Sequence, residues 1–80
     1  MNNINSLDEM QPGEQAGITA VAGKPAIRRR LIDIGLVEGT KIECVGKSPF
    51  GDPKAFLVRG AIIAIRSEDC KNILIKKEAL

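Results

Sequence analysis

The chain contains no histidine, tryptophan or tyrosine, and Phe50 and Phe56 are its only aromatic residues. Histidine is the usual general base of enzymes and the commonest protein metal ligand, so its absence argues against an enzyme and against a histidine metal centre. Two aromatic side chains are also too few for the stacking platform that binds single-stranded nucleic acids. These absences favour a protein that works by binding over one that catalyses a reaction.

Cysteines and long apolar runs are also scarce. Cys44 and Cys70 belong to no C-x-x-C pair, so we expect two reduced thiols in the core and no disulfide framework. The longest uncharged apolar run, residues 60–65, is far shorter than the roughly 20 residues that span a bilayer. Residues 1–5 lack the charged and apolar regions of a signal peptide. We therefore expect a cytoplasmic protein without direct membrane insertion.

The composition that remains is typical of a small folded domain. The chain has 80 residues, of which 44% are hydrophobic and 28% are charged. Its formal net charge of +2 is too small to indicate a nucleic-acid partner. We expect a single domain over residues 1–80, with residues 1–6 as a flexible tail.

The clearest predicted element is a short helix over residues 25–34. Pro25 suits the first helical position, and Gly35 suits a left-handed residue that ends the helix. Apolar residues spaced at i, i+4 and i+7 form one stripe along it. They are Ile27, Leu31 and Ile34.

Five strands are expected around this helix, with a bulge or bend in the first. They cover residues 14–22, 40–47, 54–58, 61–66 and 72–76. The two-residue Arg59–Gly60 loop pairs Leu57 with Ile62, so that Phe56 points into the core and Leu57 points out. Short strands of this number favour closing the sheet on itself, because closure removes exposed strand edges. The sequence therefore predicts a mainly β protein, a small and partly closed barrel.

Several segments, Pro12-Gly13-Glu14 among them, carry a resemblance to a known family. Residues 28–40 (RRRLIDIGLVEGT) resemble the signature helix and turn of the ferrous iron transport protein A (FeoA) family. Residues 48–53 (SPFGDP) and 58–60 (VRG) are similar to its P-x-G-D-P … V-R-G segment. The resemblance implies a five-stranded SH3-like barrel with one inserted short α-helix. It also implies a cytosolic, non-catalytic accessory of the FeoB-type ferrous iron transporter, with no cofactor. The alternative is a regulatory or nucleic-acid-binding barrel related to the C-terminal domain of iron-dependent repressors.

Charged residues suggest two further sites, each with a simpler explanation. Glu68 and Asp69 are adjacent and could hold a hard cation weakly, but acidic residues at the start of a helix are also an ordinary stabilising device. We expect no metal site. Arg28 and Arg29 on the predicted helix could meet an acidic partner surface, or Arg29 could pair with Asp33 on a solvated face.

The remaining candidates for partner binding are apolar. Outward positions on the predicted strands are Val45, Leu57, Ile62 and Leu74, and Phe50 lies in the loop at 48–53. Aliphatic residues are common in strands whether or not they contact a partner, and single exposed ones are normal. The sequence therefore leaves open whether these residues form a contact surface. We expect contact with the cytosolic side of the FeoB-type transporter, self-association through the outer strand face as a second use, and no nucleic-acid binding.

Overall fold

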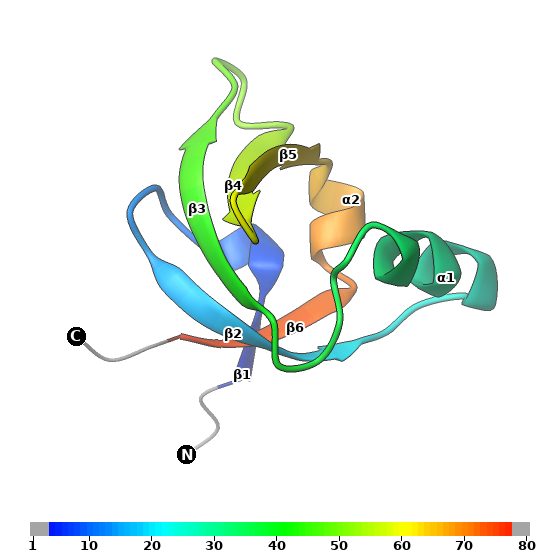
Figure 1. The fold of residues 1–80 in the computed structure, drawn as a ribbon. Coiled ribbons are helices and arrows are strands. Elements are labelled where there is room, and N and C mark those ends of the chain that lie inside the picture. Colours follow the sequence, from blue (N-terminus) through cyan, green and yellow to red (C-terminus); the bar gives the residue numbers. More distant parts are fainter. Residues whose placement is uncertain (1–3, 78–80) are drawn as a thin grey trace.

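Residues 4–77 form a curved antiparallel sheet that wraps around a single core, with a nine-residue helix and a shorter, four-residue helix on one side (Figure 1). This is a computed structural model, and it describes those residues. The sheet has six strands in the order β1-β6-β2-β3-β4-β5. The elements are β1 (Ile4–Ser6), the 3₁₀ turn η1 (Leu7–Glu9), β2 (Gln15–Val21), α1 (Pro25–Asp33), β3 (Lys41–Lys47), β4 (Lys54–Val58), β5 (Ala61–Ile65), α2 (Ser67–Cys70) and β6 (Ile73–Lys77).

The predicted mainly β barrel is confirmed, but it has six strands where five were predicted. The extra strand, β1, lies in the segment predicted to be a flexible tail, and Asn5 pairs there with Ile75 of β6. This pairing joins the two ends of the chain, so no local pattern in residues 4–6 could reveal it. Residues 1–3 of that predicted tail lie outside the described part of the chain.

Helix α1 begins and ends as its sequence predicts. Pro25 is its first residue, and Gly35 after it has a φ of +99°, which favours glycine. The Leu36 N–H donates to the Leu31 carbonyl at 3.1 Å, and the Gly35 N–H donates to the Ile32 carbonyl at 2.9 Å. These two bonds form a Schellman motif, which satisfies carbonyls that a helix end leaves without partners.

The predicted apolar stripe on this helix is partly wrong. Leu31 is buried and Ile27 packs against the core, but Ile34 is 51% exposed. Ile34 is the C-cap residue, so the chain has already left the helical path that would carry its side chain to the core.

The predicted hairpin register is confirmed. Leu57 pairs with Ile62 and Phe56 with Ile63, so Phe56 is fully buried. The bulge predicted in β2 is present between Ile18 and Ala20. The core enclosed by the sheet contains Leu7, Met10, Ala16, Ile18, Leu31, Leu36, Ile42, Cys44, Phe56, Val58, Ile65, Cys70, Ile73 and Ile75.

Both cysteines are free and buried, as predicted. The Cys70 thiol lies 3.7 Å from the Ile65 carbonyl, and burial raises its pKa from 9.0 to about 12. A thiol with so high a pKa stays protonated at neutral pH, and the thiolate is the reactive form. Cys70 is therefore a core residue and not a nucleophile.

Candidate functional site

Apolar side chains cover the outer face of the sheet over β3, β4 and β5. We call this set the outer strip: Val45, Ala55, Leu57, Ile62 and Ala64. Strand alternation points the neighbours of the buried Phe56 outward, and Leu57 pairs there with Ile62. Ile62 is 68% exposed and Val45 is 39% exposed. The structure thus brings together three of the predicted contact residues, Val45, Leu57 and Ile62, on adjoining strands.

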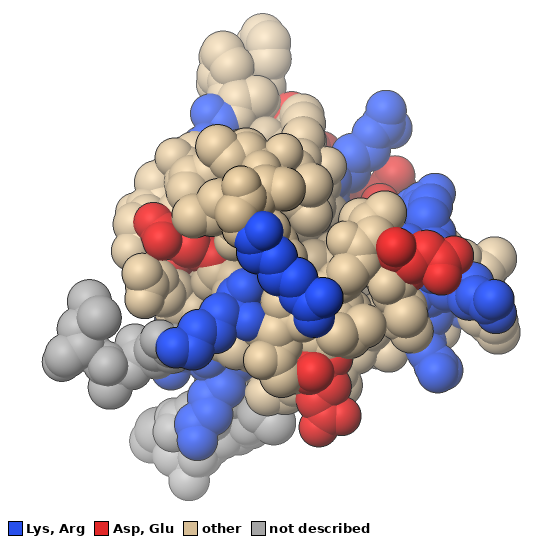
Figure 2. All heavy atoms as spheres, viewed as in Figure 1, with Lys and Arg blue, Asp and Glu red and all other residues tan. Residues whose placement is uncertain are grey.

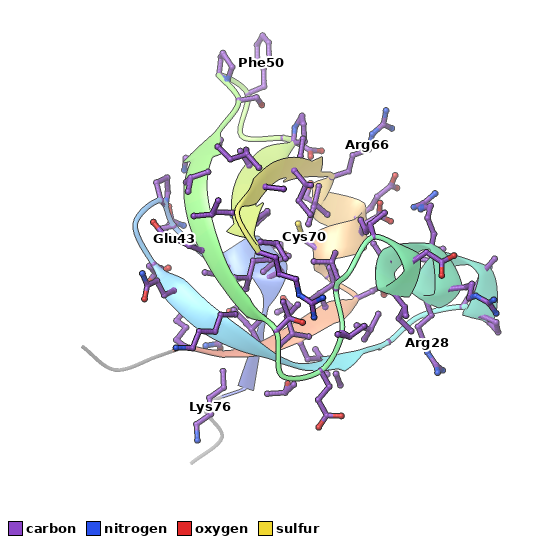
Figure 3. The ribbon with its side chains drawn as sticks, in the orientation of Figure 1. Arg28, Glu43, Phe50, Arg66, Cys70 and Lys76 are labelled. Carbon is purple, nitrogen blue, oxygen red and sulfur yellow. The ribbon has the colours of Figure 1, made fainter. Side chains whose placement is uncertain are left out.

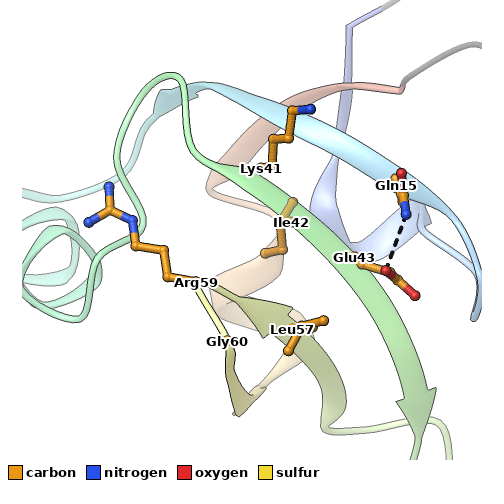
Figure 4. Close-up of a pocket in the computed structure, with 7 residues that line it drawn as sticks. All are labelled: Gln15, Lys41, Ile42, Glu43, Leu57, Arg59 and Gly60. Atoms are coloured by element: carbon orange, nitrogen blue, oxygen red, sulfur yellow. Dashed lines mark hydrogen bonds between the residues drawn. The ribbon is translucent and has the colours of Figure 1, made fainter.

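A shallow hollow of about 340 Å³ adjoins the outer strip (Figure 4). Its lining residues are Gln15, Lys41, Ile42, Glu43, Leu57, Arg59 and Gly60. Glu43 pairs with Leu57 across the strands and accepts a 3.2 Å hydrogen bond from the Gln15 side-chain amide. The hollow therefore places charge of both signs directly beside apolar surface. Sequence reasoning missed these polar residues, although the period-two alternation of β3 assigns Glu43 to the same face as Val45.

Figure 2 shows where charged side chains lie on one face of the molecule. Uncharged residues, drawn tan, cover most of its upper part, where Figure 1 places β3, β4 and β5, with a few charged side chains among them, and Lys and Arg side chains also lie lower down and around α1. An apolar centre with a charged margin is typical of protein–protein contact surfaces.

Among the large apolar residues that the structure describes, Phe50 is the most exposed, at 95%, and it stands at the tip of the loop between β3 and β4 (Figure 3). The loop that carries it is anchored at its base. The Ser48 hydroxyl donates to the Asp52 carbonyl at 2.7 Å, and an Asp52 carboxylate oxygen accepts the Ser67 N–H at 2.9 Å. That bond from the Ser67 backbone lowers the pKa of Asp52 below its ordinary 3.8. These bonds anchor the base of the loop, and Phe50 projects into solvent from its tip.

The other predicted contact residues lie apart from the outer strip. Leu74 is half-buried on β6, where it pairs with Ala20 of β2. Arg28 lines a second hollow, of about 240 Å³, which also includes Ala20. Arg29 makes the expected ion pair with Asp33, at 3.6 Å and with both side chains largely exposed.

The acidic pair considered for a cation has another role. Asp69 accepts two hydrogen bonds from the Arg30 guanidinium, at 3.0 and 3.1 Å, and so ties α2 to α1. Within residues 4–77, no three His, Cys, Asp or Glu side chains are grouped so that they could hold a metal ion. In that same range, no helix has the length and apolar character needed to cross a membrane.

The curved sheet with its inserted helix is an SH3-like barrel. Its fold matches that of the zinc-complexed FeoA of Stenotrophomonas maltophilia, which is described as a procaryotic SH3 domain protein. The two share 27% sequence identity at a TM-score of 0.80, over 92% of this chain and 95% of that one. The chain belongs to the FeoA family, because the FeoA domain model matches residues 5–77. Solved relatives in this family are named for iron(II) transport and iron uptake regulation, and not as enzymes.

Two further relatives extend this comparison. The FeoA-like protein of Clostridium acetobutylicum is 30% identical with a TM-score of 0.90, over 100% of this chain and 93% of that one. A Porphyromonas gingivalis protein that fuses Fe(2+) transport protein A to the Fe(2+) transporter FeoB is 31% identical over 70 residues. That match covers 88% of this chain but only 8% of the fusion protein.

The same fold occurs in repressors. A manganese-dependent transcriptional repressor is 13% identical with a TM-score of 0.85, over 98% of this chain and 44% of that one. At that identity the likeness shows the fold alone.

Proposed function

We propose that this protein is a non-catalytic, cytoplasmic accessory of ferrous iron uptake, which binds a FeoB-type transporter through the outer strip. The observation that carries the proposal is the outer strip itself, an apolar surface that the chain's own described elements leave partly exposed: Ile62 is 68% exposed, and Leu57 beside it is half-buried. Leaving such a surface in water is unfavourable, and covering each large aliphatic side chain stabilises a complex by about 1.5–3 kcal/mol. A partner protein accounts for its presence.

The identity of the partner rests on the fused relative. In that protein a FeoA segment and a FeoB transporter share one chain, which keeps the two at high local concentration. A separate FeoA chain needs a contact surface to reach the same arrangement. The outer strip, with charge of both signs in the adjoining hollow, has the composition for such a contact.

Phe50 extends the same surface in this proposal. It projects beyond the sheet from the loop that follows β3, the strand that carries Val45. An aromatic side chain that inserts into a pocket of the partner often supplies a large share of binding energy. Leu74, Arg28 and Arg29 lie toward the helix side and form a second, smaller contact region in the proposal.

The proposed mechanism involves no chemistry by this chain. The chain has no histidine, and its cysteines are buried. A bound accessory acts by favouring one conformation of the transporter, to the extent that it binds that conformation more tightly.

The test is a binding titration with the cytosolic domain of a FeoB-type transporter. We expect Leu57→Glu combined with Ile62→Lys to weaken binding by about tenfold or more while the melting temperature stays nearly unchanged, because both side chains point outward. Ile34→Lys is the matched control: it charges an apolar residue that is 51% exposed at the end of α1, outside the outer strip and outside the hollow that Arg28 lines, and it should bind as the wild type does.

Two results would contradict the proposal. One is a wild-type protein that does not bind the transporter domain. The other is a folded double variant that binds as tightly as the wild type. A parallel titration with an oligonucleotide at moderate salt should show no binding, whereas a nucleic-acid-binding barrel would bind it.

A further inference from the structure

Strand β5 forms one edge of the sheet and carries none of the usual protection of an edge. It is the last strand in the order and pairs only with β4. Its sequence, Ala-Ile-Ile-Ala-Ile, has no charge and no proline, and its pairing with β4 is continuous. Natural proteins protect exposed edges with lysines, prolines or bulges, because a bare edge is a template for another strand.

The hairpin register determines which backbone groups this edge offers. Arg59 and Gly60 both have positive φ, as in a type I′ turn, so Val58 and Ala61 form the hydrogen-bonded pair that closes it. Hydrogen-bonded pairs alternate along an antiparallel ladder, so the N–H and C=O groups of Ile62 and Ala64 point away from β4. No backbone hydrogen bond within residues 4–77 involves either residue on that side.

The space beside this edge is open. A groove of about 340 Å³ separates the end of β5 from α1 and α2. Ala64 and Ile65 line it on one side, and the half-exposed Ile34 lines it on the other. In Figure 1, α2 follows the end of β5, and α1 lies beyond α2. A strand laid along β5 would therefore have this groove beside its end, with α1 as the opposite wall of the groove.

We propose that the β5 edge binds a second copy of this chain, antiparallel, so that two sheets join into one. The edge is complementary to itself about Ile63. With Ile63 of the two copies opposed, Ile62 faces Ala64 of the second copy, and each such pair exchanges two backbone hydrogen bonds. A large side chain then faces a small one in both pairs.

Charge also fits this register. Strand β5 itself carries no charge, and Arg66 directly after it faces Gly60 of the second copy. No like charges are directly opposed. The outer strips of the two copies lie on the same side of the joined sheet and become continuous. This inference goes beyond the proposed function and does not depend on it.

The test is sedimentation of the full chain from micromolar to millimolar concentration. We expect the mass to rise from 8.6 kDa toward twice that value. Ala64→Pro removes an N–H that β4 does not use, and edge strands tolerate proline at such positions. It should weaken the dimer by about tenfold or more, because two of the four intermolecular bonds are lost. Ala55→Lys, on the outer face opposite Ala64, is the matched control and should dimerise as the wild type does.

The outcomes separate this edge from other surfaces. A wild-type monomer at every concentration would overturn the proposal, and so would a folded Ala64→Pro protein that dimerises normally. Loss of the dimer in Ala55→Lys alone would assign the contact to the outer face and overturn the edge. If Ala64→Pro fails to fold, hydrogen exchange of the wild type decides: the Ile62 and Ala64 amides must become protected as concentration rises.

Discussion

At the scale of single residues, Lys54 shows most clearly what sequence reasoning missed. It begins β4, points inward and is only 8% exposed. Its ammonium group donates to the carbonyl of Met10 at 2.9 Å and also to the carbonyl of Asp8. Those carbonyls belong to the segment around η1, which carries Leu7 and Met10 into the core. One lysine therefore attaches this segment to the sheet.

Replacing Lys54 should cost stability in proportion to those bonds. Lys54→Met keeps a long flexible side chain but leaves two carbonyls without their donor, which costs about 1–3 kcal/mol of unfolding free energy. Urea unfolding followed by circular dichroism measures this loss. The control is Lys76→Met on the exposed part of β6, where a change within about 0.5 kcal/mol is expected. Equal effects of the two variants would show that the Lys54 bonds contribute nothing.

At the scale of elements, the features that the sequence predicted correctly are those that depend on interactions between residues close together in the chain. Pro25 and Gly35 bound α1 through backbone geometry within a few residues, and Arg59–Gly60 determines the β4–β5 register in the same way. Strand β1 was missed because its partner strand within residues 4–77 is β6, at the far end of the sequence. The outer strip could be predicted from strand alternation, whereas the hollow beside it depends on how β2 and β3 pair.

Helix α2 also depends on a residue that is distant in the sequence. It has only four residues, and the N–H of its first residue, Ser67, donates a hydrogen bond to the Asp52 carboxylate. Because that bond lowers the pKa of Asp52 below 3.8, the charged carboxylate stabilises the fold above about pH 4. This stabilisation is lost as pH falls through the lowered pKa, when the carboxylate takes up a proton.

The pH dependence can be isolated with Asp52→Asn, because asparagine retains an oxygen that can accept the Ser67 N–H but carries no charge. We expect a lower urea midpoint than the wild type at pH 7, and a smaller difference at pH 2, because the wild-type carboxylate loses its charge as the pH falls through its lowered pKa. Glu38→Gln, which neutralises an exposed carboxylate in the turn after α1, serves as the control and should leave the urea midpoint at pH 7 near that of the wild type. A difference that is equal at both pH values would mean that the Asp52 charge has no part in holding α2.

At the scale of the whole molecule, the two aromatic residues have opposite environments. Phe56 is fully buried in the core, with 0% of its surface exposed to solvent, whereas Phe50 is 95% exposed. A chain of 80 residues has a net stability of only about 4–12 kcal/mol. Its single core therefore has little reserve against the loss of one large side chain.

We expect Phe56→Ala to cost about 3–5 kcal/mol, through lost burial and the cavity that remains, and so to remove much or all of the stability. Phe50→Ala removes the same atoms from the loop tip and should leave the melting temperature unchanged. Under the proposed function it should nevertheless weaken binding to the transporter domain. The measurements are the melting temperatures of both variants and a titration of the Phe50→Ala protein with the transporter domain. A Phe56→Ala protein that melts with the wild type would mean that β4 is shifted by one residue, which would exchange its buried and outer faces and place the outer strip inside the barrel.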